Sequence, residues 1–144
     1  MHGKAELTAS PGRIDPADAA WQNSRKPLVG QFVFRGKTVF VIANHLVSKG
    51  GDQPLTGQYQ PVTRSSENQR HAQAVEVNAF VKDILKVQKN ANVLAVGDMN
   101  DFEFSGTAKI LEGDGELWSA IKSLPASERY TYDYQATRRC WTRS

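Results

Sequence analysis

Two neighbouring stretches rich in valine and phenylalanine predict a β-hairpin. They cover residues 31–34 and 37–43, and Arg35-Gly36 separates them. A short break with glycine between two such runs favours a hairpin turn. The second predicted strand leads directly into Asn44 and His45. Residues 1–30 contain several prolines and predict loop, with one short helical turn over residues 16–21.

A helical pattern follows a long polar stretch. Residues 48–65 contain adjacent glycines and two prolines, and a loop of this length inside a compact domain is usually functional or mobile. We expect Ser66 to cap a helix over residues 67–87, with Gln69 in the capping-box position. The apolar side chains at three- and four-residue spacing, expected to form the buried stripe, are Ala72, Val75, Ala79, Phe80, Ile84 and Val87.

The second half of the chain begins with a short apolar run over residues 93–96. Because turn residues bound this run, we expect a strand that is buried on both faces. It leads into Gly97-Asp98-Met99-Asn100-Asp101. Weaker patterns predict short helices over 105–111 and 117–124 and an edge strand over 130–134. Together these elements predict a layered α/β sandwich without repeats or an internal domain boundary.

Composition narrows the class of protein but not its function. The chain has 144 residues, of which 40% are hydrophobic and 23% charged, so it can form a core and is not of disordered composition. It has no apolar run long enough for a membrane span, and its first residues do not resemble a signal peptide. A net charge of +3 permits a polyanionic partner without arguing for one. One cysteine and three histidines exclude an internal disulfide and a structural zinc site of the usual ligand count.

Polar residues gather where two predicted strands end, and this is where chemistry is expected. Asn44 and His45 follow one strand, and Asp98 and Asn100 follow the other. A carboxylate, a carboxamide and an imidazole suit metal-assisted phosphoryl chemistry, with Asp98 holding a water, Asn100 contacting phosphate or a cation, and His45 exchanging protons. The same Asp-x-Asn spacing is also good turn chemistry, and a lone histidine at a strand end is more often a satisfied polar residue.

Two cations near these clusters have two interpretations each. Arg25, in Ser24-Arg25-Lys26-Pro27, is either a surface-loop residue or a contact to phosphate. Lys49 stands beside Gly50-Gly51 and resembles part of an anion-binding loop, although loop lysines are usually only solvated.

Taken in chain order, five motifs resemble the endonuclease/exonuclease/phosphatase superfamily. They cover residues 24–28 (Ser-Arg-Lys-Pro-Leu), 44–51 (Asn-His-Leu-Val-Ser-Lys-Gly-Gly), Arg70, 97–102 (Gly-Asp-Met-Asn-Asp-Phe) and 129–132 (Arg-Tyr-Thr-Tyr). The Ser-Lys-Gly-Gly-Asp-Gln-Pro-Leu loop and the Glu-Arg-Tyr-Thr-Tyr segment are similar to secreted bacterial extracellular nucleases. The resemblance spans about residues 7–135. Any one motif is weak, and the order of all five carries the resemblance.

The resemblance implies part of a four-layer α/β sandwich and hydrolysis of phosphodiester bonds. It implies that His45, Asp98 and Asn100 are catalytic and that Asp98 and Asn100 hold Mg²⁺, or another divalent cation such as Mn²⁺ or Ca²⁺. It implies substrate contacts from Arg25, Asn44, Lys49 and Thr131. The implied substrate is nucleic acid, DNA in preference to RNA, and the implied location is extracellular.

The resemblance also implies what this chain lacks. The family's fold is about twice as long, and its first half supplies an Asn and a metal-binding Glu. We therefore assign residues 1–135 to the C-terminal portion of such a domain and residues 136–144 to a non-family tail. Read with codons starting one base earlier, Cys140-Trp141-Thr142 gives Leu then Asp, as the family has before its final His. We hypothesise a frameshift near Gln135, which sequencing the gene across these codons tests.

Three alternatives remain open from the sequence. One is a phosphatase or phospholipid-cleaving hydrolase of the same fold, which a substrate panel distinguishes. Another is a non-catalytic remnant that binds nucleic acid with salt-dependent affinity but leaves it uncut. The third is a generic α/β domain in which the motifs are coincidental. If the family resemblance holds, the isolated chain is expected to have little activity, because it lacks the metal-binding Glu and the family's final Asp-His pair, and catalytic groups that act as a unit fail together.

Overall fold

The computed structural model describes residues 3–53, 56, 58, 60–130, 132–134 and 137–139. It confirms the α/β class, with one four-stranded sheet and two α-helices in this part of the chain. The strands of the main sheet are β1 (Gly12–Arg13), β2 (Leu28–Phe34), β3 (Lys37–His45) and β4 (Asn92–Asp98) in that order. The helices are α1 (Ser65–Val87) and α2 (Gly106–Glu112), with 3-10 turns η1 (Ala19–Trp21), η2 (Lys49–Gly51), η3 (Ala120–Ser123) and η4 (Ala126–Glu128).

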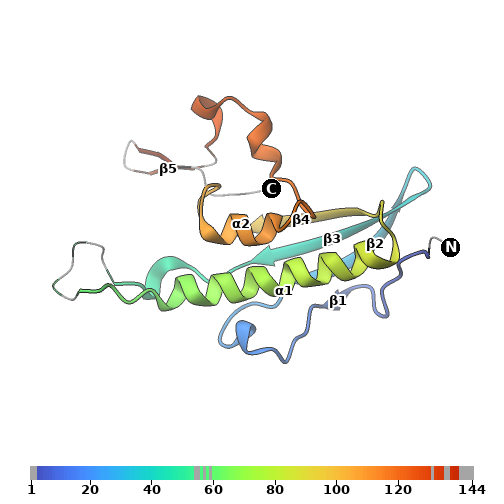
Figure 1. Ribbon diagram of the computed structural model, residues 1–144, viewed down its shortest axis with the longest axis horizontal. Helices are drawn as coiled ribbons and strands as arrows, with labels where there is room; N and C mark the ends of the chain where they lie inside the picture. The colour runs from blue at the N-terminus through green and yellow to red at the C-terminus, as the bar shows by residue number, and fades with distance from the viewer. Residues whose placement is uncertain are drawn as a thin grey trace.

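The hairpin predicted from the valine-rich stretches is confirmed and is longer than expected. β2 and β3 pair antiparallel from Leu28↔Ala43 to Phe34↔Lys37. Arg35 and Gly36 both have positive φ, at 49° and 74°, which is the two-residue turn whose twist suits a hairpin. β4 then pairs parallel to β3 after the chain has crossed through α1. Figure 1 shows α1 running along the sheet with α2 beside it.

The helix over α1 is confirmed, but two details of its prediction are wrong. Ser66 does not cap it: the helix begins at Ser65, and the carboxylate of Asp52 accepts hydrogen bonds from the backbone N–H and hydroxyl of Ser66, at 2.9 and 2.5 Å. Gln69 forms no capping box, because its amide donates to the backbone carbonyls of Ala20 and Gln22 instead.

The buried face of α1 also differs from the predicted stripe. Val75 and Val87 are half exposed, and of the predicted positions only Ile84 is fully buried and Phe80 packs against the core. The face that packs on the sheet instead includes buried polar side chains. The buried residues of α1 are Ser66, Arg70, Gln73, Ala74, Val77, Asn78, Val81 and Ile84.

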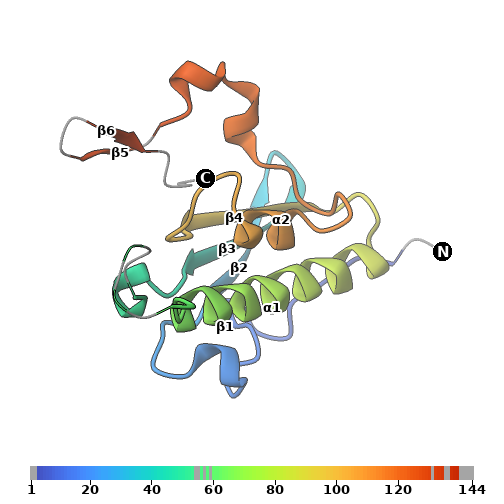
Figure 2. The same cartoon turned by 60° about the vertical axis from the view of Figure 1, so that its left-hand side comes forward.

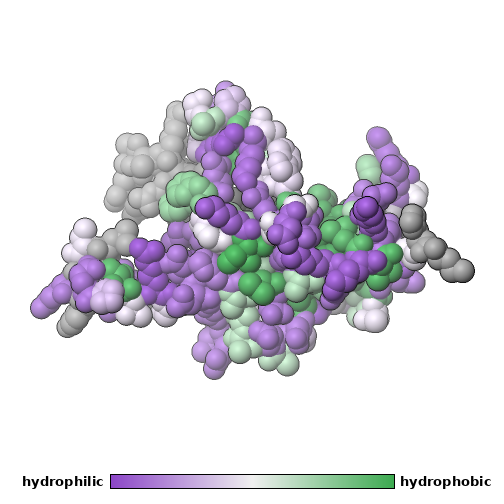
Figure 3. Space-filling model, in the orientation of Figure 1, coloured by the Kyte–Doolittle hydropathy of each residue, from purple (hydrophilic) through white to green (hydrophobic). Residues whose placement is uncertain are grey.

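The hydrophobic core lies between one face of the sheet and the helices. Ile42 and Val29 from the sheet meet Val77 and Val81 from α1, and Leu111 of α2 joins the same cluster. Figure 2 shows the two helices on this side of the sheet. On this side the surface is largely hydrophilic, with hydrophobic residues gathered near the middle of the view (Figure 3). No helix among the described residues is long and apolar enough to cross a membrane.

The opposite face of the sheet is largely uncovered, which corrects the prediction for residues 93–96. The run was expected to be buried on both faces, but Leu94 is 53% exposed. Because residues of a strand alternate between faces, the pairing register puts Leu94 on the same face as Leu28, Phe32 and Phe34 of β2, which are also exposed. We call these four residues the open sheet face.

The later elements confirm their predictions in part. α2 has the expected stop, because Gly113 adopts a positive φ of 59°, and Ser105 caps its start by accepting from the N–H of Ala108. Residues 117–124 form only the short turn η3. The predicted edge strand is realised as β5 (Tyr132–Tyr134), which pairs antiparallel with β6 (Thr137–Arg139) in a separate two-stranded sheet.

Candidate functional site

His45 and Asp98 are brought side by side by the parallel pairing of β3 and β4. They are register partners at the carboxyl ends of these two strands. Both lie at the end of the open sheet face, because they continue the alternation that includes Leu94. The backbone N–H of Leu46 donates to the carbonyl of Asp98 at 3.0 Å and fixes the two strand ends to each other. The two predicted polar clusters therefore form one site.

Close backbone approach at Gly97 makes this junction possible. Gly97 has a φ of 121°, and a Cβ atom there would collide with the backbone carbonyl of Asn44. Only glycine adopts this conformation without strain.

Asn100 lies in a turn. The sequence analysis gave such a turn as the non-catalytic interpretation of the Asp-x-Asn spacing. The φ of Asn100 is 51°, and its backbone N–H donates to Oδ1 of Asp98 at 2.9 Å. Its side-chain amide donates to the carbonyl of Leu46 at 2.8 Å, and the residue is buried. This bond leaves the carbonyl oxygen of the side chain as the group that Asn100 can offer to a cation or water.

A cationic cavity lies beside His45. It has a volume of about 540 Å³ and is lined by Arg13, Arg25 and Lys26, together with Leu28, Ala43, Asn44 and His45. No carboxylate lines it. Arg25 and His45 are exposed, so both can reach a ligand in the cavity. An open pocket with several cations and no acid suits a phosphate group.

Arg13 is the lining residue that the sequence did not identify. It lies on the short strand β1, whose pairing with β2 places Arg13 opposite Leu28. Its Nη1 donates to the backbone carbonyl of Lys26 at 2.6 Å. Arg13 therefore ties the segment that carries Arg25 to the edge of the sheet. Arg13 lies in the proline-rich stretch over residues 1–30, for which the sequence predicted a loop, and it was not among the predicted binding residues.

Asn44, which also lines the cavity, is buried. Its Nδ2 donates to the carbonyls of Ile42 and Val96, at 3.0 and 3.4 Å. Its Oδ1 is buried and has no hydrogen-bond partner among the described residues. Asn44 was predicted to contact substrate, and the structure gives its side chain a visible role in holding β3 to β4.

Lys49 is not among the lining residues of the cavity and belongs to an ionic network. We call it the buried ionic network because Arg70 and Asp101 at its centre are buried, whereas the Lys49 side chain is 34% exposed. Its Nζ is 2.8 Å from Oδ1 of Asp101, and Thr107 donates to Oδ2 of Asp101 at 2.6 Å. Arg70 reaches Asp101 at 3.4 Å and Asp52 at 3.8 Å. The ion pair with Asp101 gives Lys49 a role in the loop structure, and the substrate contact expected of it stays a prediction. Thr131, the remaining predicted contact, lies outside the described residues.

The carboxylates of this network have lowered pKa values. Burial alone raises the pKa of Asp101, but hydrogen bonds from Lys49 and Thr107 outweigh it, so the net pKa is lowered. Burial likewise opposes a lowered pKa at Asp52, where the hydrogen bonds from Ser66 and the charge of Arg70 prevail. Both side chains are therefore ionised at neutral pH.

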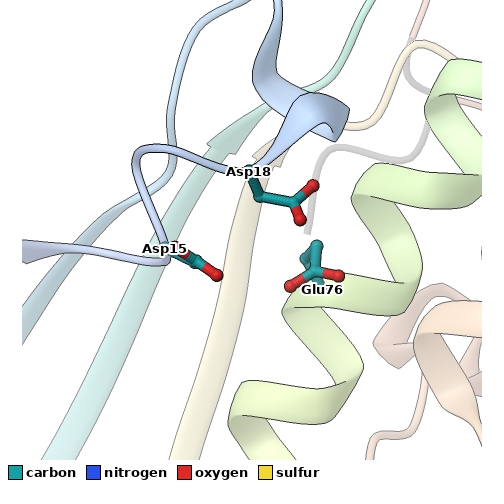
Figure 4. A group of neighbouring side chains, drawn as sticks. All are labelled: Asp15, Asp18 and Glu76. Atoms are coloured by element: carbon teal, nitrogen blue, oxygen red, sulfur yellow. The ribbon is translucent and has the colours of Figure 1, made fainter.

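An acidic cluster that the sequence analysis did not single out lies between α1 and the loop after β1. Asp15 and Asp18, from the loop after β1, face Glu76 of α1, and their carboxylate oxygens lie within 4.8 Å of one another (Figure 4). Burial and then the charges of Asp18 and Asp15 raise the pKa of Glu76. Oδ1 of Asp18 is already engaged, since it accepts from the N–H of Ala20 at 2.7 Å.

The residues at the strand ends fit a magnesium ion only in part. Mg²⁺ is held by oxygen ligands, and one or two carboxylates with substrate phosphate and water suffice. Asp98 and the side-chain oxygen of Asn100 are of this kind. Asp98 is not part of any group of three acidic, histidine or cysteine side chains in the described ranges. This chain alone therefore offers the minimum set of ligands.

Comparison with known proteins does not assign a family. No protein-family model matches the chain, and no curated protein sequence matches it. Among solved structures, sphingomyelinase C from Streptomyces griseocarneus is similar with a TM-score of 0.47 and 18% identity. The similarity covers 64% of this chain and 28% of that enzyme. A likeness of this extent assigns neither a family nor an activity.

Proposed function

We propose that this chain carries the phosphate-binding part of a metal-assisted phosphodiester hydrolase, and that its substrate is nucleic acid, DNA in preference to RNA. The observation that supports it most directly is the cavity in which Arg13, Arg25 and Lys26 converge beside His45 without a carboxylate. The resemblance of the motifs to extracellular nucleases supports the choice of nucleic acid. The same resemblance supports an extracellular location.

The chemistry follows from what each group can do. The cations of the cavity neutralise a phosphate and hold it beside His45, and Arg25 is exposed. A water held by Asp98 attacks phosphorus and gives a proton to the Asp98 carboxylate, the bond from phosphorus to the leaving oxygen breaks, and the leaving oxygen takes a proton. In this proposal His45, the register partner of Asp98, supplies that proton as a general acid. A bound Mg²⁺, held by Asp98 and Asn100, would stabilise the negative charge that develops on the phosphate.

The open sheet face supports the proposal that this chain is one part of a larger sandwich. Leu28, Phe32, Phe34 and Leu94 form an exposed apolar surface on the face that ends at His45 and Asp98. A second sheet packed on this face would cover the apolar side chains. It would also bring further side chains to the strand ends, where the metal ligands are few. We therefore expect the isolated chain to bind substrate better than it cleaves it.

The test is binding and plasmid nicking by the chain as it stands. In EDTA, we expect duplex DNA to bind with an affinity that falls as salt rises, because cations in the cavity release counterions from the phosphates. Arg25→Ala should weaken this binding and lower the salt slope by about one unit. Arg35→Ala is the matched control, because Arg35 lies in the hairpin turn at the other end of β2 and β3.

Nicking in Mg²⁺ then separates the outcomes. Nicking that disappears in His45→Ala would show that this chain assembles a working site. Binding without nicking, by a chain shown to be folded by circular dichroism, supports the partial-site proposal. Equal effects of Arg25→Ala and Arg35→Ala would refute the assignment of the cavity. Turnover of a phosphomonoester or of sphingomyelin vesicles in place of DNA would favour the phosphatase or phospholipid alternative.

A further inference from the structure

The loop that follows Asn100 carries an exposed aromatic ring in a fixed orientation. Phe104 is 71% exposed, and its ring is stacked on that of Phe102 with centroids 5.2 Å apart and an interplanar angle of 3°. A single exposed phenylalanine on a loop is common and needs no explanation. Here the ring is not single, because the second aromatic residue determines how it is turned.

The support beneath this ring continues into the buried ionic network. Nζ of Lys49 lies 4.1 Å from the centroid of the Phe102 ring, within range of a cation–π contact. Lys49 is in turn paired with Oδ1 of Asp101 at 2.8 Å, and Asp101 is buried. The backbone N–H of Phe102 also donates to Oδ1 of Asp101 at 3.0 Å. Phe102 is thus held from its backbone and from its ring.

The position of this stack relates it to the candidate site. Lys49 follows His45 along the chain, and Phe102 and Phe104 follow Asp98 and Asn100. Both segments leave the carboxyl ends of the parallel strands β3 and β4, which are adjacent. The ring therefore lies at the end of the sheet where the phosphate cavity opens.

We propose that Phe104 is a stacking platform for an unpaired base of the nucleic acid whose phosphate occupies the cavity. This inference rests on the proposed function and narrows its substrate to strands with accessible bases, such as single strands and frayed ends. A flat ring held in one orientation suits the face of a base, and stacking on it is insensitive to sequence. A lipid surface, by contrast, is bound by a broad apolar face with basic residues around it, whereas this platform is one pair of stacked rings.

Two probes of equal length separate stacking from phosphate binding. One is an oligothymidylate, and the other is an abasic oligomer with the same number of phosphates, both measured by fluorescence anisotropy in EDTA. We expect the chain to bind the oligothymidylate at least about fivefold more tightly than the abasic oligomer, which is the lower end of what one stacked base contributes. Equal affinity for the two probes would overturn the platform.

Three variants at position 104 sharpen the result. Phe104→Ala should reduce oligothymidylate affinity to that of the abasic probe and leave abasic binding unchanged. Phe104→Trp should retain the preference, and Phe104→Leu should lose it, because leucine keeps the apolar surface without the flat ring. Retention of the preference by Phe104→Leu would overturn the proposal. The exposure of Phe104 means that none of these changes should alter thermal melting, which is checked alongside.

The remaining arms distinguish failure of the platform from failure of the proposed function. Arg25→Ala should weaken binding of both probes. If it does so while the unmodified chain binds the two probes equally, phosphate binding in the cavity is supported and the stacking role of Phe104 is overturned. Absence of binding to either probe would overturn both. Sedimentation with phosphatidylcholine–sphingomyelin vesicles that is lost in Phe104→Ala but kept in Phe104→Leu would overturn base stacking in favour of lipid insertion.

Discussion

Replacing Arg70 with methionine tests whether the buried ionic network holds the loops around the site. The Arg70 side chain is 2% exposed and reaches four partners. Nη1 donates to Oγ of Ser66 at 2.9 Å and to the carbonyl of Val47 at 3.3 Å, and the guanidinium pairs with Asp101 and Asp52. Methionine fills a similar volume but leaves these acceptors without their donor.

The expected magnitude follows from burial. Removing one partner of a buried ion pair costs about 3–5 kcal/mol, because the remaining charge stays desolvated without compensation. The stability of a domain of this size is about 5–15 kcal/mol, so Arg70→Met removes a large share of it. With a urea dependence of about 2 kcal/mol per molar, the unfolding midpoint should fall by about 1.5–2.5 M.

The assay is urea unfolding at pH 7 followed by circular dichroism, with Arg64→Met as the matched control. Arg64 is exposed and pairs with Glu67 at 3.0 Å, so this change should cost no more than about 0.5 kcal/mol. If the two variants differ by less than about 1 kcal/mol, the network does not hold the structure as we argue. A gain in stability on Arg70→Met would contradict the reasoning outright.

The network also predicts how stability depends on pH. The lowered pKa of Asp101 and of Asp52 means that each favours the folded state when ionised. This contribution is present above their unfolded value of about 3.8 and is lost as pH falls through the lower folded value. Urea midpoints should therefore fall below about pH 4, less steeply in Arg70→Met, because Arg70 is one cause of the lowered pKa of Asp52.

Three further predictions concern other parts of the fold. Gly97→Ala should destabilise the chain by about 2–5 kcal/mol, because a Cβ atom there would collide with the carbonyl of Asn44. Gly36→Ala, a control with open space around the new Cβ atom, should cost only about 1 kcal/mol. Equal urea midpoints for the two variants would contradict this prediction. Glu76→Gln should raise the melting temperature at pH 7 but not at pH 4. The raised pKa of Glu76 in the folded state means that its protonated form favours folding at low pH and that this contribution is lost as pH rises. A higher melting temperature at both pH values would exclude charge repulsion as the cause. Phe32→Lys should reduce self-association in sedimentation velocity while leaving circular dichroism unchanged, since Phe32 is 57% exposed on the open sheet face; unchanged association would show that this face does not drive it.

The features that the sequence predicted correctly are those decided by nearby residues. Arg35-Gly36 determines a hairpin turn within its own two positions. Ser105 and Gly113 bound α2 in the same local way. The strand ends at His45 and Asp98 were also predicted, and their pairing follows from the parallel crossover through α1.

The features that the sequence missed depend on residues distant along the chain. Asp52 displaces the predicted cap of α1 from 14 positions away. The buried face of α1 was misjudged because Gln73 and Asn78 pack inward, where distant carbonyls satisfy them. Arg13 entered the cavity only through the pairing of β1 with β2. Leu94 was expected to be covered because an apolar run does not reveal whether anything packs on it.

The parallel pairing of β3 with β4 has a consequence for how the site forms during folding. The hydrogen bond from Asn100 to the carbonyl of Leu46 joins residues 54 positions apart, whereas the β2–β3 hairpin closes through two residues. Closing the longer loop costs more chain entropy and must await the docking of α1, so contacts of this kind form late. We expect the hairpin to act as an early template and the junction of His45 with Asp98 to be completed last. A spectroscopic probe attached at that junction should then change more slowly during refolding than the helical circular dichroism signal.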